Sequence, residues 1–252
     1  MHIVVTGASS GIGEAIARQW AGHGARVSLV ARRVDKLEAL ASELGGKAFP
    51  SDLAEPANAG AFLPAAEAAH GPVDVLVNNA GMQFVQEFTS VEPVDGERLL
   101  ALNVLTPLRL SHAVLPGMVA RRRGGIINVA SVAGLVPTPN MVHYTASKFA
   151  LAGASEALRW ELRDTGVRVL TVYPGPVETA MMRAAVAQFD ASSPASRLPA
   201  GTTAELARKV YAAFERNDAR VIYPGAYTVA RWLGPLAADI TGRFSPRTRG
   251  RP

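Results

Sequence analysis

The sequence contains no cysteine in its 252 residues. This absence excludes disulfide bonds, thiol nucleophiles and cysteine-ligated metal sites, although it does not identify the cellular compartment. A chain of this length can form one α/β domain or two smaller ones, and its hydrophobic content of 48% suffices for a large core without a disulfide. Any catalysis must therefore use side chains other than thiols.

The first residues lack the basic region, the apolar core and the cleavage site of a signal peptide. No apolar run reaches the length of about 20 residues that a transmembrane helix needs. A reducing cytoplasm is compatible with the lack of cysteine. We therefore expect a cytoplasmic protein.

Acidic residues are fewer than basic ones, with 21 Asp and Glu against 26 Lys and Arg, which gives a net charge of +5. A positive balance can attract nucleic acids. Here, however, the basic residues are not interleaved with aromatic residues, and the sequence carries no nucleic-acid-binding motif. We therefore expect no nucleic-acid partner.

Short apolar segments alternate with longer helical patterns along the chain, and no linker, repeat or low-complexity block interrupts them. This alternation predicts a single domain, residues 1–252, with a Rossmann-type doubly wound parallel sheet of about seven strands and helices on both faces, an α/β three-layer sandwich. The expected strands are residues 2–6, 26–31, 47–50, 73–78, 125–131, 167–173 and 219–223. The expected helices are residues 12–23, 34–44, 56–70, 95–122, 142–165 and 203–217.

A glycine-rich turn separates the first expected strand from the first expected helix. It reads Thr6-Gly7-Ala8-Ser9-Ser10-Gly11-Ile12-Gly13, with its glycines at spacings of four and two. Glycine lets the backbone turn tightly and approach a ligand with no Cβ in the way. The amides at a helix start, helped by the positive end of the helix dipole, can then bind a phosphate. The spacing differs from G-x-G-x-x-G, but the order of strand, turn and helix predicts nucleotide binding rather than an ordinary tight loop.

Tyr144 and Lys148 lie four residues apart in an expected helix, so their side chains project from the same face. A phenol is a poor proton donor or base at neutral pH, because its reference pKa is about 10. A nearby ammonium favours the phenolate and lowers that pKa toward the working range. The pair alone is common on helices as two solvated residues, so its interpretation depends on the other motifs.

Six motifs in register make residues 2–223 resemble a short-chain dehydrogenase/reductase of the compact, single-domain branch. They are the segment Thr6–Gly13, the run Asn78-Asn79-Ala80-Gly81, Asn103, Ser131, the pair Tyr144 and Lys148, and the segment Pro174–Thr179. The resemblance implies the catalytic residues Asn103, Ser131, Tyr144 and Lys148, and no metal. It also implies a cofactor site formed by Gly7, Ser9, Ser10, Gly11, Ile12, Gly13, Arg32, Arg33, Asp52, Leu53, Asn79, Ala80, Gly81, Tyr144, Lys148, Pro174, Gly175, Val177 and Thr179.

The resemblance implies hydride transfer between nicotinamide C4 and a carbonyl carbon, coupled to proton transfer. Tyr144 would exchange the proton, Ser131 would hold the carbonyl oxygen, and Lys148 would lower the tyrosine pKa and bind the nicotinamide ribose. Asn103 would hold a water that links Lys148 to solvent. Two alternatives remain open, because Asn103 could merely satisfy a helix irregularity and Ser131 could merely cap a strand end.

The end of the second expected strand indicates NADP(H) rather than NAD(H). In doubly wound folds an acidic residue there binds the ribose 2′-hydroxyl and repels a 2′-phosphate. This sequence has Ala31 at that position, followed by Arg32 and Arg33. Arginine is well shaped to bind a phosphate, although the two could also be exposed charges. Asp52, before Leu53, resembles the family's adenine contact, or it could be only a cap.

The residues expected around the substrate are mostly apolar. They are Gln83, Phe84, Val85, Ala133, Gly134, Leu135, His143, Met181 and Met182, with no convergent Arg or Lys beyond the cofactor set. This composition predicts a small, uncharged, hydrophobic carbonyl compound or alcohol as substrate. His143 could contact it, but we favour an ordinary residue at a helix start. Residues 180–202 follow the Pro-Gly segment, where the family has its substrate lid, and we favour a lid over a plain surface excursion.

The C-terminal extension, residues 224–252, is apolar and aromatic before it becomes rich in proline and arginine. Such a segment can dock on a membrane surface, but we favour packing over the substrate pocket or a partner subunit. We expect the last residues, 245–252, to be disordered. The expected helix 142–165 carries small residues on one face, which fits the family's pairing through this helix and predicts a homodimer or homotetramer.

Two functions of different classes follow from these residues. The favoured one is an NADP(H)-dependent carbonyl reductase or alcohol dehydrogenase with Tyr144 as general acid and base. The alternative is a non-catalytic regulatory protein that senses NADP(H). Such a sensor would normally have lost one of the four catalytic residues, and none is lost here. An epimerase or dehydratase of the extended branch would need a larger C-terminal substrate domain than this chain has.

Overall fold

The computed structural model describes residues 1–188 and 200–232. They form one parallel sheet of seven strands in the order β3-β2-β1-β4-β5-β6-β7, as the alternation predicts. The strands are β1 (His2–Thr6), β2 (Arg26–Ala31), β3 (Lys47–Pro50), β4 (Val75–Asn78), β5 (Gly124–Val129), β6 (Val167–Pro174) and β7 (Arg220–Tyr223). The helices are α1 (Gly11–Ala21), α2 (Val34–Leu44), α3 (Leu63–His70), α4 (Pro93–Leu100), α5 (Thr106–Ala120), α6 (Val142–Glu161), α7 (Ala180–Val186), α8 (Thr203–Glu215) and α9 (Val229–Trp232).

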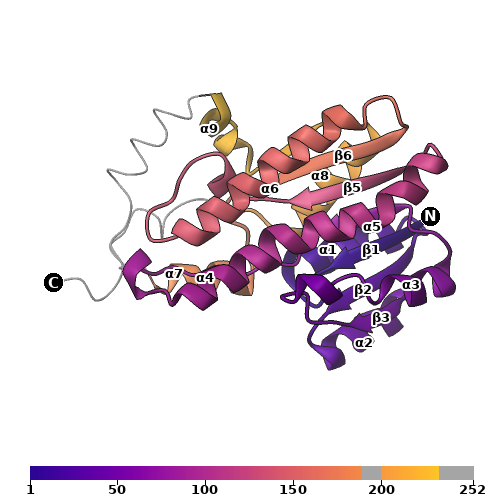
Figure 1. Ribbon diagram of the computed structural model, residues 1–252, viewed down its shortest axis with the longest axis horizontal. Coiled ribbons are helices and arrows are strands. Elements are labelled where there is room, and N and C mark those ends of the chain that lie inside the picture. Colours follow the sequence, from indigo (N-terminus) through magenta and orange to yellow (C-terminus); the bar gives the residue numbers. More distant parts are fainter. Residues whose placement is uncertain (189–199, 233–252) are drawn as a thin grey trace.

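Helices cover both faces of the sheet, as the alternation of side chains along each strand requires (Figure 1). Ile3 and Val5 of β1 join a core cluster with α1, α2 and α8, whereas Val4 joins a second cluster with α3 and α5. Trp20 of α1 is completely buried in the first cluster, and Met118 of α5 is completely buried in the second. The sheet is therefore the central layer of a three-layer sandwich.

The chain reverses its direction of travel across the sheet between β1 and β4, which are hydrogen-bonded neighbours. From β1 the chain goes to β2 and β3 at one edge, and it then returns to β4 and continues toward β7. In open parallel sheets such a switch point leaves a crevice outside the carboxyl ends of the strands, where ligands bind. The strand order alone thus indicates that the candidate site lies at the carboxyl ends of β1 and β4.

Three expected helices differ most from the observed ones. The helix expected at 56–70 is a short 3-10 turn, Pro56–Asn58, followed by α3. The helix expected at 95–122 begins at Pro93 and contains a π-helical segment, Ala101–Leu105, between α4 and α5. The helix expected at 142–165 ends at Glu161. A π segment inserts a residue into the helical repeat, and apolar spacing alone does not reveal it.

The continuous helix Pro93–Ala120 is 28 residues long, with a mean hydropathy of 1.3 in its most apolar window. By length and composition it could cross a membrane, so our expectation that no segment is long enough needs correction. The core helix of a globular domain has the same properties. Here Leu110, Val114 and Met118 of α5 pack into the core beside β4 and β5, which accounts for the apolar composition.

Candidate active site

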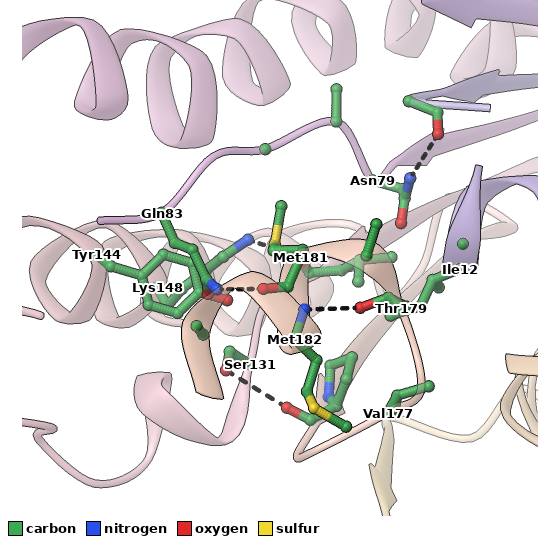
Figure 2. A pocket seen from close by; sticks show the side chains of 18 of the residues that line it. Ile12, Asn79, Gln83, Ser131, Tyr144, Lys148, Val177, Thr179, Met181 and Met182 are labelled. Atoms are coloured by element: carbon green, nitrogen blue, oxygen red, sulfur yellow. Dashed lines mark hydrogen bonds between the residues drawn. The ribbon is translucent and has the colours of Figure 1, made fainter. Parts of the chain in front are cut away.

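A cavity of 1310 Å³ lies at the carboxyl ends of the strands, between the glycine-rich turn, the start of α6 and helix α7. All but two of the residues predicted for the site line it. The exceptions are Gly13 and Asn103, which lie behind its wall. Ser131, Tyr144, Lys148, Met181 and Met182 are among the residues that line it (Figure 2).

The glycine-rich turn wraps around the side chain of Asn79, which follows β4. The Nδ2 atom of Asn79 donates to the carbonyl of Thr6 at 2.9 Å and to that of Gly7 at 3.4 Å. A Cβ on Gly13 would lie 2.4 Å from that nitrogen, and a Cβ on Gly7 would lie 2.8 Å from it. Gly7 and Gly11 also have positive φ angles of 66° and 64°, which favour glycine. Gly13 thus shapes the turn without lining the cavity.

The turn presents free backbone donors to the cavity. The first amides of a helix have no acceptor within the helix, and the Ser10 side chain makes no capping hydrogen bond at the start of α1. These amides and the positive helix end suit a phosphate. These donors therefore fit the pyrophosphate of a dinucleotide.

Arg33 reaches from the end of β2 back to this turn. Its Nε and Nη2 atoms donate to the Ser9 hydroxyl at 3.1 and 2.9 Å, and Nη2 also donates to the Ser10 hydroxyl at 2.5 Å. Arg32 and Ala31 line the cavity beside it. A positively charged rim with no carboxylate at the strand end suits a 2′-phosphate.

Asp52 lines the cavity and also has structural bonds. Its Oδ1 atom accepts from the amide of Ala54 at 3.0 Å, and its Oδ2 atom lies 3.4 Å from Arg98. The expectation that Asp52 caps a turn is therefore correct, and this does not exclude an adenine contact. Leu53 is buried beneath it and lines the same wall.

Ser131, Tyr144 and Lys148 come together because β5 ends beside the first turns of α6. The Ser131 hydroxyl accepts from the amide of Ala133 at 3.1 Å and donates to the carbonyl of Pro174 at 3.3 Å. Lys148 is 5% exposed, its Nζ donates to the carbonyl of Val129 at 3.0 Å, and it lies 5.5 Å from the centre of the Tyr144 ring. Ser131 is thus both a cap and a wall residue.

The ionisation of the pair differs from our expectation. Burial raises the pKa of Tyr144, and only a hydrogen bond with Ser131 opposes that rise. Burial also lowers the pKa of Lys148 from 10.5 to about 8. Burial therefore outweighs the lowering of the tyrosine pKa that we expected from the Lys148 ammonium, which lies 5.5 Å from the ring centre and donates to Val129. Tyr144 therefore holds its proton at neutral pH, as a proton donor requires.

Asn103 is completely buried in the π-helical segment. Its Oδ1 atom accepts from the amide of Met82 at 2.9 Å, and its Nδ2 atom donates to the carbonyl of Met82 at 2.9 Å and to the Ser147 hydroxyl at 3.0 Å. Both amide protons are thus used within the protein. The side chain ties the loop after β4 to α6; Asn103 lies in a helix irregularity, as the open alternative had it, but these bonds are to residues outside that helix.

Several residues predicted near the substrate do not reach the cavity. Gln83, Ala133, Met181 and Met182 line it, whereas Phe84, Val85, Gly134, Leu135 and His143 do not. His143 stacks on Phe88 at 5.2 Å and packs against Gly96, so the preferred view of it as an ordinary helix residue agrees with its position.

Tyr227 and Arg183 line the cavity from segments that we expected over the pocket, the C-terminal extension and the lid, but neither residue was predicted individually. The Tyr227 ring lies over Gly175, where an added Cβ would be 2.9 Å from the ring, and its hydroxyl is buried without a hydrogen-bond partner among the described residues. Arg183 of α7 lines both this cavity and an adjacent one of 760 Å³ beside Ser10 and Gly11. The expectation of no further cation in the cleft is therefore wrong. Of the predicted lid and tail, residues 189–199 and 233–252 lie outside the described residues.

Comparison with known proteins agrees with this geometry. A sequence profile of short chain dehydrogenases matches residues 1–189. The chain is 42% identical over 180 residues to nodulation protein G of Rhizobium sp. (strain N33), which covers 71% of this chain and 74% of that protein.

Two solved structures are similar along most of their length. A short-chain dehydrogenase from Sphingobium yanoikuyae in complex with NADPH has a TM-score of 0.81 and 31% identity, over 100% of this chain and 98% of that one. A metagenomic short-chain oxidoreductase in complex with NADP has a TM-score of 0.72 and 35% identity, over 88% of this chain and 96% of that one.

Proposed function

Because this chain belongs to the short-chain dehydrogenase family, we propose that it is an NADP(H)-dependent oxidoreductase that interconverts a carbonyl compound and a secondary alcohol. The observation that carries the proposal is the convergence of Ser131, Tyr144 and Lys148 on one wall of an otherwise largely apolar cavity. A protein that only senses the cofactor has no use for a proton donor aimed at a second ligand.

The bound nicotinamide supplies or accepts the hydride. The protein must then stabilise and protonate the alkoxide that develops on the substrate carbon. Tyr144 carries its proton at neutral pH, because burial raises its pKa, and it donates this proton. Ser131 binds the same oxygen: its hydroxyl keeps the bond that it accepts from the Ala133 amide and turns its single proton from the Pro174 carbonyl to the substrate oxygen. The Lys148 ammonium places positive charge beside the developing anion.

The cofactor is held at the turn between β1 and α1, with Arg32 and Arg33 on the 2′-phosphate. Ser9 and Ser10 hold the Arg33 guanidinium above this turn, so little side-chain freedom is lost on binding. The absence of an acid at Ala31 removes the repulsion that selects NAD(H). Solved relatives carry NADPH and NADP, which supports the same choice.

The substrate is an uncharged, hydrophobic ketone, aldehyde or secondary alcohol. Beyond Tyr144 the wall consists mainly of Leu102, Ala133, Val136, Met141, Met181 and Met182. Arg183 is shared with the smaller cavity next to the glycine turn, so we assign its charge to the cofactor side of the cleft. An apolar wall strongly disfavours a charged substrate, because ions lose hydration there.

The substitution Tyr144→Phe tests the function directly. Removing the hydroxyl should lower turnover of carbonyl compounds by at least about a hundredfold, the usual contribution of a positioned proton donor. The dissociation constant for NADPH, measured by fluorescence titration, should stay within about threefold because the ring is kept. Near-wild-type turnover in a screen of ketones with NADPH would refute the mechanism.

A second copy of the chain is the partner we propose. The outer face of α6 exposes an apolar stripe of Val142, Ala146, Phe149, Ala150, Gly153, Ala157 and Trp160, which recur at helical spacing. A Cβ added at Gly153 would meet nothing within 4 Å, so another helix can approach closely there. This face therefore suits a dimer through α6.

A further inference from the structure

Helix α7 spans the cavity with little support of its own. None of its residues is buried. The two ends of the excursion that carries it are joined at the base, where the amide of Glu178 donates to the carbonyl of Gly201 at 2.9 Å and the amide of Gly201 donates to that of Pro176 at 2.9 Å. Helix α7 is therefore attached at a closed base, and it covers the cleft without being packed into the core.

One side chain joins α7 to the opposite wall of the cleft. The Nε2 atom of Gln83 donates to the carbonyl of Met181 at 3.1 Å, between residues 98 apart in the sequence. Figure 2 draws this bond as a dashed line between Gln83 and Met181. Within residues 1–188 and 200–232, it is the hydrogen bond that ties α7 to the protein outside the segment 176–201.

Hydrogen bonds hold the loop on both sides of Gln83. The preceding residue, Met82, is held at both its amide and its carbonyl by the buried side chain of Asn103, each at 2.9 Å. Three residues later, the amide of Gln86 donates to the carbonyl of Asn140 at 2.8 Å. The loop is thus fixed on both sides of Gln83, and the unpacked helix is the part that can move.

We propose that Gln83 is the latch of the lid: its amide donor holds Met181, and with it α7, closed over the bound dinucleotide and substrate. This inference rests on the proposed function for the identity of the ligands, but the latch itself is a property of the protein alone. Gln83 is a positioning residue. It acts through Met181 and Met182, which exclude water from the space beside Tyr144 and slow the escape of what is bound there.

Two substitutions remove the donor in different ways. Gln83→Glu keeps the shape but turns an acceptor toward the Met181 carbonyl, and Gln83→Met keeps the length without adding charge. If loss of the Gln83–Met181 hydrogen bond causes faster cleavage and faster NADPH release, both variants should show these changes. An effect of the added negative charge on Lys148 would appear with Gln83→Glu alone. Gln86→Glu is the matched control, because Gln86 is exposed and does not line the cavity.

The first measurement is the rate of trypsin cleavage after Arg183 in the ligand-free protein, followed by mass spectrometry of the new peptide end. Arg183 is exposed on α7, and cleavage tracks the population of the open lid when opening is fast. Loss of one hydrogen bond should raise this rate about threefold to tenfold in both Gln83 variants. Rates equal to those of the wild type and of Gln86→Glu would overturn the latch.

The second measurement is the rate of NADPH dissociation, by stopped-flow fluorescence with excess NADP as competitor. Both Gln83 variants should release NADPH about threefold to tenfold faster and show a higher KM with a kcat that is not reduced. Faster cleavage with unchanged NADPH release would overturn the role of the latch in the site. If the wild type binds no NADPH, the proposed function fails, and the trypsin comparison still decides whether the latch exists.

Discussion

Replacing Lys148 with methionine should stabilise the fold while it abolishes turnover. Lys148 is 5% exposed, and burial lowers its pKa from 10.5 to about 8. One pKa unit corresponds to about 1.4 kcal/mol, so holding this ammonium in the fold at neutral pH costs about 3 kcal/mol. Methionine is uncharged and loses mainly the bond to the Val129 carbonyl, worth about 1 kcal/mol. The variant should therefore be more stable by about 2 kcal/mol.

The gain in stability of Lys148→Met over the wild type should depend on pH. Between about pH 8 and 10.5 the unfolded chain keeps the lysine proton that the folded chain has released. The free energy of unfolding of the wild type therefore rises with pH across this window. Below pH 8 both states carry the charge, so the full advantage of the variant is present there. The advantage should shrink as pH rises and disappear toward pH 10.5.

Urea unfolding followed by tryptophan fluorescence measures this difference, because Trp20 is completely buried. Wild type and Lys148→Met are compared at pH 7 and at about pH 9.5, at equal protein concentration. Lys36→Met serves as control, since Lys36 is exposed on α2 and should change stability by less than about 0.5 kcal/mol. A variant that is less stable at pH 7, or an advantage that is equal at both pH values, would refute the reasoning.

Three further predictions concern other parts of the molecule. Arg32→Asp should lower kcat/KM with NADPH relative to NADH by at least about tenfold, because it removes a cation and adds a repulsive charge; an unchanged ratio in steady-state assays would contradict the cofactor assignment. Gly153→Arg should convert the proposed dimer to a monomer in light scattering. Because a Cβ at this position meets nothing within 4 Å in the same chain, the substitution should not strain the fold or lower the unfolding temperature measured at low protein concentration. Burial lowers the pKa of His2 below 6.5, so the free energy of unfolding should fall as pH falls below 6.5. His2→Gln should flatten that dependence in urea unfolding at pH 7 and about pH 5; an identical slope would exclude His2 as its cause.

Much of the fold was predictable because parallel α/β folds repeat a local pattern. Each strand is a short apolar run bounded by polar or glycine residues, and β1, β2 and β3 lie where the sequence places them. The interruption of the long helix at Ala101–Leu105 was not predictable. It depends on Asn103 bonding to Met82 and Ser147 across the fold, and these partners are far from it in the chain.

In the candidate site, too, some residues were predictable from the sequence and others were not. The residues that line the cavity from the glycine turn and from the ends of β4, β5 and β6 were predicted, because motif order along the chain determines their place at the switch point of the sheet. Gly13 was predicted as a cofactor contact, but it lies behind the wall, where it makes room for Asn79. Tyr227 belongs to no motif and reaches the cavity only because the chain folds back over Gly175.

The sequence by itself determined the fold class, the family and the residues of the proposed proton-transfer site, since these follow from contiguous motifs whose geometry is local. Only the tertiary structure decided the ionisation of that site. Spacing places Tyr144 and Lys148 on one helix face, but the pKa of each depends on how completely the rest of the protein excludes water around it. The same holds for the contact between Gln83 and Met181, because a hydrogen bond between residues 98 apart exists only once the sheet has brought two distant segments to one cleft.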